Sequence, residues 1–175
     1  MTFLGIDLGD HGALAWLEGE GGLELADMPV VQTAARYELD IPELWTLLRS
    51  RKVAAITIEL LHAMPPSMGG ASANFKRGAY IYAVRAMCHA IGAPLVEVPP
   101  KKWQKYFGYS KGAAEGQRVD TKGWSYLKAS RFFPGAEFKS GRGRVLDGRC
   151  DAALLALYGR QTWGRQLGKE ISGDI

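Results

Sequence analysis

The stretch FLGIDLGDHGALAWLEGEGGLELADMPV, residues 3–30, contains three short apolar runs separated by two turn signals. The runs are FLGIDLG, ALAWLE and LELADMPV, and the glycine-containing turns GDHG and GEGG join them. Apolar runs joined by such short turns are typical of β-hairpins. The sequence therefore predicts a meander of three antiparallel strands at the start of the chain.

The rest of the chain alternates between helical and extended patterns. The run VAAITIEL, residues 53–60, is continuously apolar without a helical period, which favours a buried central strand with parallel neighbours. HAMPPSMGG, residues 62–70, is rich in turn formers and predicts a loop. The other expected elements are a helix around 41–51, a helix at 72–91, a strand at 93–98, a short helix at 99–108 that begins with proline, a helix at 121–133 and a last helix at 147–158. A meander followed by alternating helices and strands indicates an α/β fold, with helices packed on a mixed sheet.

The expected helix at 72–91 has two apolar stripes at helical spacing. The first consists of Phe75, Ala79, Tyr82, Ala86 and Ala90, and the second of Ile81, Val84 and Cys88. The sheet would cover one side. The other side would be covered by another subunit or by a second layer of the same chain.

Length and composition indicate an ordinary globular chain. A domain of 175 residues, 47% of them apolar, can bury about two-thirds of its unfolded surface. The opening MTFLGIDLGD has no basic region and no sustained apolar run, so we expect no signal peptide, no membrane span and a cytoplasmic location. Cys88 and Cys150 lack metal-ligand spacing, and we interpret them as reduced packing residues.

Charge is distributed unevenly along the chain. Residues 1–100 contain 7 Lys and Arg against 11 Asp and Glu, whereas residues 101–149 contain 12 against 4. A basic block of this kind is consistent with a polyanionic partner, most simply nucleic acid, or with a solvated basic face that has no partner.

Four carboxylates stand where the hydrophobic pattern does not require them. Asp7 interrupts the first strand, and Glu59 ends the apolar strand at 53–60. Asp147 and Asp151 begin the last helix, and because four helical residues turn about 400°, they project about 40° apart on one face. Two carboxylates about 5 Å apart repel by roughly 3 kcal/mol at an effective dielectric of about 20, and a bound cation relieves this repulsion. Oxygen ligands alone favour Mg²⁺ or Mn²⁺ over zinc, and such ions can catalyse phosphodiester hydrolysis.

Each acid also has an ordinary structural role open to it. Asp147 can cap the helix, and Asp151 is a favourable charge in an early helical turn. Asp7 can serve a turn, and Glu59 can face water at the end of a strand. Four such roles arising independently in one sheet-and-helix arrangement are much rarer than one shared role, so we favour a common site. Asp10 lies in the turn and is interpreted as structural.

Four segments in order carry a family resemblance: GIDLGDHGALA, ITIELLHAMPP, VPPKKWQKYFG and LDGRCDAALLALYG. Their order and intervals resemble the RuvC-type Holliday-junction resolvases, most closely the phage-borne branch. Each motif alone is weak, but the ordered set is specific. The resemblance covers roughly residues 1–160, which we expect to form a single nuclease domain, with a C-terminal tail at 161–175.

The resemblance implies a ribonuclease H-like fold with a mixed five-stranded sheet, a homodimer and Mg²⁺-dependent cutting of four-way and other branched DNA, with Mn²⁺ able to substitute. The products would carry 5′-phosphate and 3′-hydroxyl ends, as in recombination, repair or phage DNA processing. Asp7 resembles the first-strand catalytic acid, and Glu59 the fourth-strand acid. Asp147 and Asp151 resemble the acidic pair of the C-terminal helix, and Lys122 resembles a lysine near the scissile phosphate.

The chain departs from the family pattern at three places. Its helix pair is separated by four residues where many cellular members have three, although both spacings share a helical face. Leu60 follows the strand acid where cellular relatives often have glutamine. Gln104 follows the tryptophan of the short basic helix where phage relatives often have lysine, and Lys105 comes next.

The basic block is expected to contact DNA phosphates, which would make binding strongly salt-dependent. The candidate contacts are Lys101, Lys102, Lys105, Lys111, Arg142, Arg144 and Arg149. FKSGRGRVLDGR, residues 138–149, is interpreted as a flexible clamp that leads into the acidic helix, whereas Trp103 and Trp124 are expected in the core. Apolar side chains can unstack bases at the centre of a junction. This chain has candidates for such a wedge in the 62–70 loop and just after it. The candidate wedge residues are Met64, Met68 and Phe75.

Other function classes share single features with this chain. GIDLG also opens actin-like ATPases and sugar kinases, but those proteins need two such domains and about twice this length. An RNA-processing nuclease of the same fold and a junction-binding protein without catalysis remain alternatives. The intact set of four acids favours an enzyme over a junction-binding protein without catalysis.

Overall fold

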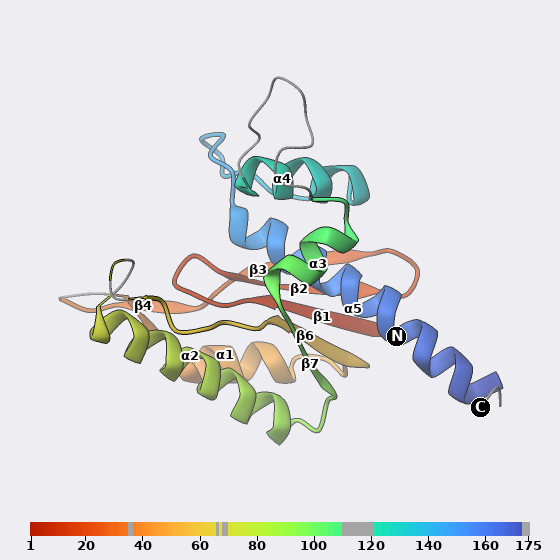
Figure 1. Cartoon of the computed structure of the whole chain (residues 1–175), viewed down its shortest axis with the longest axis horizontal. Helices are drawn as coiled ribbons and strands as arrows, with labels where there is room; N and C mark the ends of the chain where they lie inside the picture. Colours follow the sequence, from red (N-terminus) through yellow and green to blue (C-terminus); the bar gives the residue numbers. More distant parts are fainter. Residues whose placement is uncertain (35–36, 66, 68–69, 110–120, 173–175) are drawn as a thin grey trace.

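A five-stranded mixed sheet forms the centre of the protein (Figure 1). The computed structural model describes residues 1–34, 37–65, 67, 70–109 and 121–172. The strand order is β3-β2-β1-β6-β7. The strands are β1 (Thr2–Asp7), β2 (Ala13–Glu18), β3 (Leu23–Asp27), β6 (Ala55–Glu59) and β7 (Leu95–Val98). β1, β2 and β3 pair antiparallel, while β6 lies between β1 and β7 and is parallel to both, which confirms the predicted mixed sheet.

Helices cover both faces of this sheet. One face is covered by α1 (Ile41–Arg49) and α2 (Ala71–Ala90), and the other by α5 (Asp147–Ser172), with α3 (Pro100–Tyr106) and α4 (Thr121–Phe132) packed beyond it (Figure 1). No helix in the described part of the chain is long and apolar enough to cross a membrane.

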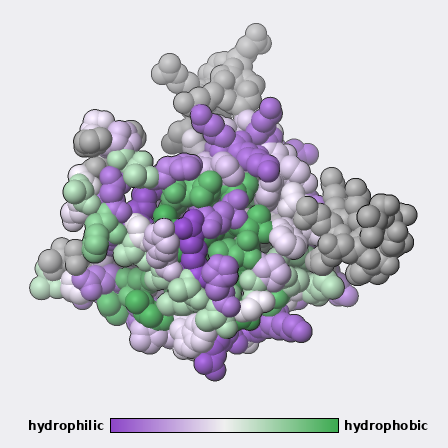
Figure 2. Space-filling view, turned by 60° about the horizontal axis from the view of Figure 1, so that its bottom comes forward, coloured by the Kyte–Doolittle hydropathy of each residue, from purple (hydrophilic) through white to green (hydrophobic). Residues whose placement is uncertain are grey.

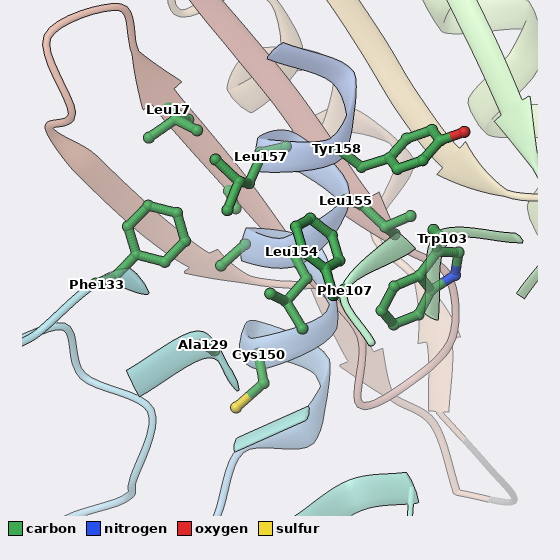
Figure 3. Close-up of a cluster of buried hydrophobic side chains, with 14 of the residues drawn as sticks. Leu17, Trp103, Phe107, Ala129, Phe133, Cys150, Leu154, Leu155, Leu157 and Tyr158 are labelled. Carbon is green, nitrogen blue, oxygen red and sulfur yellow. The ribbon is translucent and has the colours of Figure 1, made fainter. Parts of the chain in front are cut away.

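Side chains alternate between these two faces because successive residues of a strand point in opposite directions. Leu4 and Ile6 of β1 join the α1–α2 core, together with Ile56 and Ile58 of β6. The residues between them therefore face α5. Figure 3 shows Leu154, Leu155 and Leu157 of α5 surrounded by buried side chains of neighbouring elements. Those labelled there are Leu17, Trp103, Phe107, Ala129 and Phe133.

Two features differ from the sequence expectations. The third strand ends at Asp27 rather than continuing to Val30, because Pro29 lacks the N–H that a ladder needs. A small separate hairpin follows, formed by β4 (Val30–Gln32) and β5 (Tyr37–Leu39), and the sequence analysis did not predict it.

The last helix is also longer than expected, because it continues from Tyr158 to Ser172. The Thr162 hydroxyl donates a hydrogen bond to the carbonyl of Tyr158 at 2.7 Å, so this polar residue is accommodated within the helix. The helix crosses the boundary expected at residue 160, and the division into domain and tail stays a prediction.

Helix α5 lies unusually close to the sheet where glycine occurs. A Cβ atom added to Gly5 would lie 2.1 Å from the carbonyl oxygen of Ala152 and 2.3 Å from the backbone nitrogen of Ala156. One added to Gly148 would lie 2.2 Å from the carbonyl oxygen of His11, in the β1–β2 turn. Only residues without a side chain allow this separation, so glycine sets the height of the helix above β1.

We expect Gly5→Ala to lower the free energy of unfolding by about 3 kcal/mol or more, because backbone atoms of α5 must move away from β1. Gly78→Ala is the matched control, since its added Cβ meets nothing within 4 Å and alanine favours a helix interior by about 0.5–1 kcal/mol. Urea unfolding of both variants measures the difference. Equal stabilities would show that the close approach is not required.

Candidate functional site

Strands β1 and β6 bring Asp7 and Glu59 to one edge of the sheet. The two strands are parallel, and Ile6 pairs with Ile58, so the residues that follow are neighbours. Ile6 and Ile58 both face the α1–α2 core, and alternation therefore turns Asp7 and Glu59 toward α5. The pairing of β1 with β6 thus brings together two acids that are 52 positions apart in sequence.

The first two turns of α5 add Asp147 and Asp151 to this edge. The negative charges of Asp151, Glu59 and Asp147 all act on Asp7. Burial raises the pKa of Asp7 well above its ordinary value, and these three charges raise it further. Asp7 therefore lies close enough to the other three acids for their charges to act on it, as a shared site requires.

Of the two acids at the start of α5, Asp151 is the more deeply buried. Burial raises its pKa to about 7, and the charges of Glu59 and Asp147 act in the same direction. The Ser125 hydroxyl lies near enough to lower this pKa. However, the Ser125 oxygen and Oδ1 of Asp151 are both buried without a hydrogen-bond partner of normal geometry among the described residues.

Glu59 is partly buried and has a specific partner. The indole N–H of Trp103 on α3 donates a hydrogen bond to its Oε2 atom at 3.1 Å. Burial raises the pKa of Glu59, while this hydrogen bond and the nearby guanidinium of Arg77 lower it. The sequence analysis placed Trp103 in the core, and it is buried there, but its bond to Glu59 was not foreseen.

Asp147 is paired with Lys122 of α4, whose Nζ atom lies 2.5 Å from Oδ2. Burial acts to raise the pKa of Asp147, but the hydrogen bond and charge of Lys122 and the charge of Arg144 outweigh it, so the pKa is lowered. The sequence analysis had placed Lys122 near a scissile phosphate. The structure puts its ammonium at the edge of the acidic cluster.

These residues suit a hard divalent cation. The cluster offers oxygen ligands only, Oδ1 of Asp151 has no hydrogen-bond partner among the described residues, and Asp7 is surrounded by like charges. Within the described ranges no three His, Cys, Asp or Glu side chains are already arranged as a metal site. The ion pair of Asp147 and the hydrogen bond of Glu59 each hold one of the acids.

Asp10 lies outside this cluster, although it follows Asp7 by three residues. Its carboxylate accepts hydrogen bonds from Lys76 and from the hydroxyl of Tyr80, each at 2.6 Å. Lys76 also donates to the carbonyl of Tyr37 at 2.7 Å. Asp10 thus ties the β1–β2 turn to α2, and Lys76 ties the small hairpin to the same helix.

The candidate DNA contacts have different surroundings. Lys101, Lys102 and Lys105 are exposed on α3, and Arg142 and Arg144 are exposed in the turn before α5. Arg149 is instead half-buried and makes a two-pronged ion pair with Asp27, at 2.6 and 2.9 Å. Lys111 lies outside the described residues. A role in DNA binding stays a prediction for all seven residues.

Two of the three candidate wedge residues are described. Phe75 is 82% exposed on the first turns of α2. Met64 is partly buried, and its backbone N–H and carbonyl are both bonded to the side chain of Asn74, at 2.8 and 2.9 Å. Met68 lies outside the described residues. Phe75 is thus the more accessible of the two side chains, while the wedge itself stays a prediction.

Comparison with known proteins identifies the fold. No protein-family model and no curated protein sequence matches the chain. A structure of Thermus thermophilus RuvC in complex with a Holliday junction substrate superposes with a TM-score of 0.61 at 12% identity, over 95% of this chain and 96% of that chain. A second Thermus thermophilus RuvC structure gives 0.60 at 18% identity, over 93% and 97%. The chain therefore has the ribonuclease H-like fold of the RuvC structures, as the ordered motifs predicted.

We expect Asp151→Asn to stabilise the metal-free protein at pH 8 by at most about 4 kcal/mol, the scale of a pKa raised from 3.8 to about 7. The folded protein binds this proton more tightly than the unfolded chain does. The gain is therefore absent below pH 4, grows up to pH 7 and is constant above it.

Urea unfolding in EDTA at pH 5 and pH 8 measures this gain. Glu20→Gln, in the exposed turn between β2 and β3, is the control for removing a carboxylate. If the stability gained by Asp151→Asn is no larger at pH 8 than at pH 5, the carboxylate of Asp151 is not destabilised by burial and by the neighbouring acids.

Proposed function

We propose that this protein is a Mg²⁺-dependent endodeoxyribonuclease that cuts four-way and related branched DNA. One observation carries the proposal: Asp7, Glu59, Asp147 and Asp151 come from three distant segments and act on one another at a single edge of the sheet. The fold shared with RuvC supports the same assignment. Such an enzyme would act in the cytoplasm of a bacterium or of a phage-infected host.

The acids would hold the cation and the chain would orient the substrate around it. Asp7, Glu59 and Asp151 are the ligands that the geometry favours most, and Asp147 joins them once its ion pair with Lys122 opens. A bound Mg²⁺ would supply activation of water and stabilisation of the leaving oxygen. Lys122, released from Asp147, can then donate to a non-bridging oxygen of the scissile phosphate. In-line attack by water with release of the 3′ oxygen leaves 5′-phosphate and 3′-hydroxyl ends.

Basic residues on two sides of the acids would guide the DNA backbone. The α3 lysines follow directly after β7, which lies next to β6 and Glu59. The turn that carries Arg142 and Arg144 is closed by the bridge between Lys139 and Val145, and it leads directly into Asp147. A DNA backbone whose phosphates bind at both places would lie across the acidic cluster.

The exposed side of helix α2 is the candidate surface for the proposed homodimer. Its buried side carries Tyr80, Val84 and Cys88, which confirms that the sheet covers one side of the helix. On the other side Phe75 is 82% and Tyr82 69% exposed. Figure 2, which brings the lower side of Figure 1 forward, shows apolar and polar patches mixed on this face. A two-fold axis here would give two active sites, as symmetric cutting requires.

We expect Asp7→Asn to reduce cutting of a four-way junction in Mg²⁺ by roughly 10³-fold or more, with little change in junction affinity. Asp10→Asn is the matched control, because Asp10 is an acid of the same turn that bonds to α2 rather than joining the cluster. Gel assays of cleavage and of binding in Ca²⁺ measure the two quantities. Normal cutting by Asp7→Asn would overturn the proposed function, and cutting of structured RNA alone would change its substrate.

We expect the double reversal Arg142→Glu/Arg144→Glu to weaken junction binding and to flatten its dependence on salt. Loss of two phosphate contacts should reduce the slope of log K against log salt by about 2. The control, Arg49→Glu/Lys52→Glu, makes the same charge change beside the starting end of β6, away from Glu59. If the two double variants weaken binding equally, Arg142 and Arg144 contribute only through the net charge of the protein.

A further inference from the structure

Trp103 is the feature of the site that the nuclease assignment leaves without a role. Its side chain is fully buried, yet its indole N–H donates to Oε2 of Glu59 at 3.1 Å. Figure 3 shows its ring beside the hydrophobic cluster, with the nitrogen on the side away from Leu154 and Phe107. The apolar part of the ring thus belongs to the core and its polar atom to the acidic site.

Two other tryptophans show that this bond is specific. The indole nitrogens of Trp16 and Trp124 are also buried, but neither has a hydrogen-bond partner among the described residues. Burial alone therefore does not pair an indole N–H in this protein. Trp103 differs because its partner is one of the four acids.

The backbone explains why Trp103 reaches Glu59. The amide of Leu60 donates to the carbonyl of Val98 at 2.8 Å, so β6 and β7 remain paired to their ends. Helix α3 begins two residues after Val98, at Pro100, and Trp103 lies in its first turn. The short connection therefore leaves the ring beside the end of β6.

A second contact fixes the orientation of the ring. Trp103 packs against Trp124 of α4, with ring centroids 6.1 Å apart and planes tilted by 40°. Because Trp103 is also fully buried, the ring has little freedom to turn its N–H elsewhere. The donor is consequently in place before any ligand arrives.

We propose that Trp103 is a positioning residue of the metal site, whose N–H holds the Glu59 carboxylate by Oε2 and leaves Oε1 to bind the cation. The inference rests on the proposed function, because it assumes that Glu59 is a ligand. Donors that orient metal-binding groups typically contribute about 10–100-fold to metal affinity. Trp103 would therefore act on the metal through Glu59, without contacting the metal or the DNA.

Metal binding by DNA-free protein tests this role. We expect Trp103→Phe, which keeps an aromatic ring but lacks the donor, to weaken Mn²⁺ binding by about 10–100-fold in calorimetry. Trp124→Phe removes the same atoms from the same ring pair, but its N–H has no partner in the described part of the chain, so it reports the effect of altered packing. Its Mn²⁺ affinity should stay within about 2-fold of wild type. Equal losses in both variants would overturn the proposal.

The indole resonances of the metal-free protein provide a test that does not need the phenylalanine variant to fold. Once assigned, the indole N–H peaks of Trp103 and Trp124 can be followed in a proton–nitrogen correlation spectrum. Glu59→Ala removes the acceptor, so the Trp103 resonance should move upfield while that of Trp124 stays in place. An unmoved Trp103 resonance would show that the hydrogen bond is absent and would overturn the proposal.

The two hypotheses fail in different ways. If wild-type protein neither binds Mn²⁺ nor cuts junctions, the proposed function is wrong, and the positioning role falls with it. If wild-type protein binds Mn²⁺ and cuts, but Trp103→Phe binds Mn²⁺ equally well, only the positioning role is wrong.

Discussion

The close approach of α5 to β1 is the contact on which the rest of the protein depends. Gly5 has no side chain, so the backbone at Ala152 and Ala156 can lie directly against the central strand. The helix carries Asp151 one residue before Ala152, and β1 carries Asp7 two residues after Gly5. A contact made only of backbone and methyl groups therefore determines how near two carboxylates come. The geometry of the acids is a consequence of packing.

Packing and electrostatics oppose each other at this edge. Burial of the large apolar residues on both faces holds the sheet and α5 together, while the four acids they bring together disfavour ionisation of Asp7 and Asp151. The protein relieves part of this strain by giving single acids separate partners, Lys122 for Asp147 and Trp103 for Glu59. Asp7 and Asp151 are left to share the remaining negative charge, and this is the charge that a divalent cation would neutralise.

The sequence pattern predicted those features of the fold that depend on hydrophobic periodicity and on the order of elements along the chain. The apolar runs and turn signals of β1–β3, the apolar run of β6 and the helical spacing of Asp147 and Asp151 were sufficient to place the acids on one sheet and one helix. Features set by tertiary contacts were not predictable in this way. The β4–β5 hairpin has strands of only three residues, and the Arg149–Asp27 pair joins residues that are 122 positions apart. The Trp103 bond left one weak signal: an indole N–H in the core often finds an acceptor, and Glu59 is an acid at the end of the apolar run 53–60.

The position of β1 also bears on how the protein is made. This strand is translated before the other strands of the sheet, yet it is the middle strand, and its α5-facing side stays uncovered until residues near 152–156 have left the ribosome. Domains that depend on such distant contacts complete their core late in synthesis. Asp7 and Asp151 consequently meet only after the start of α5 has been synthesised. A nascent fragment that ends before α5 would therefore lack the complete set of four acids.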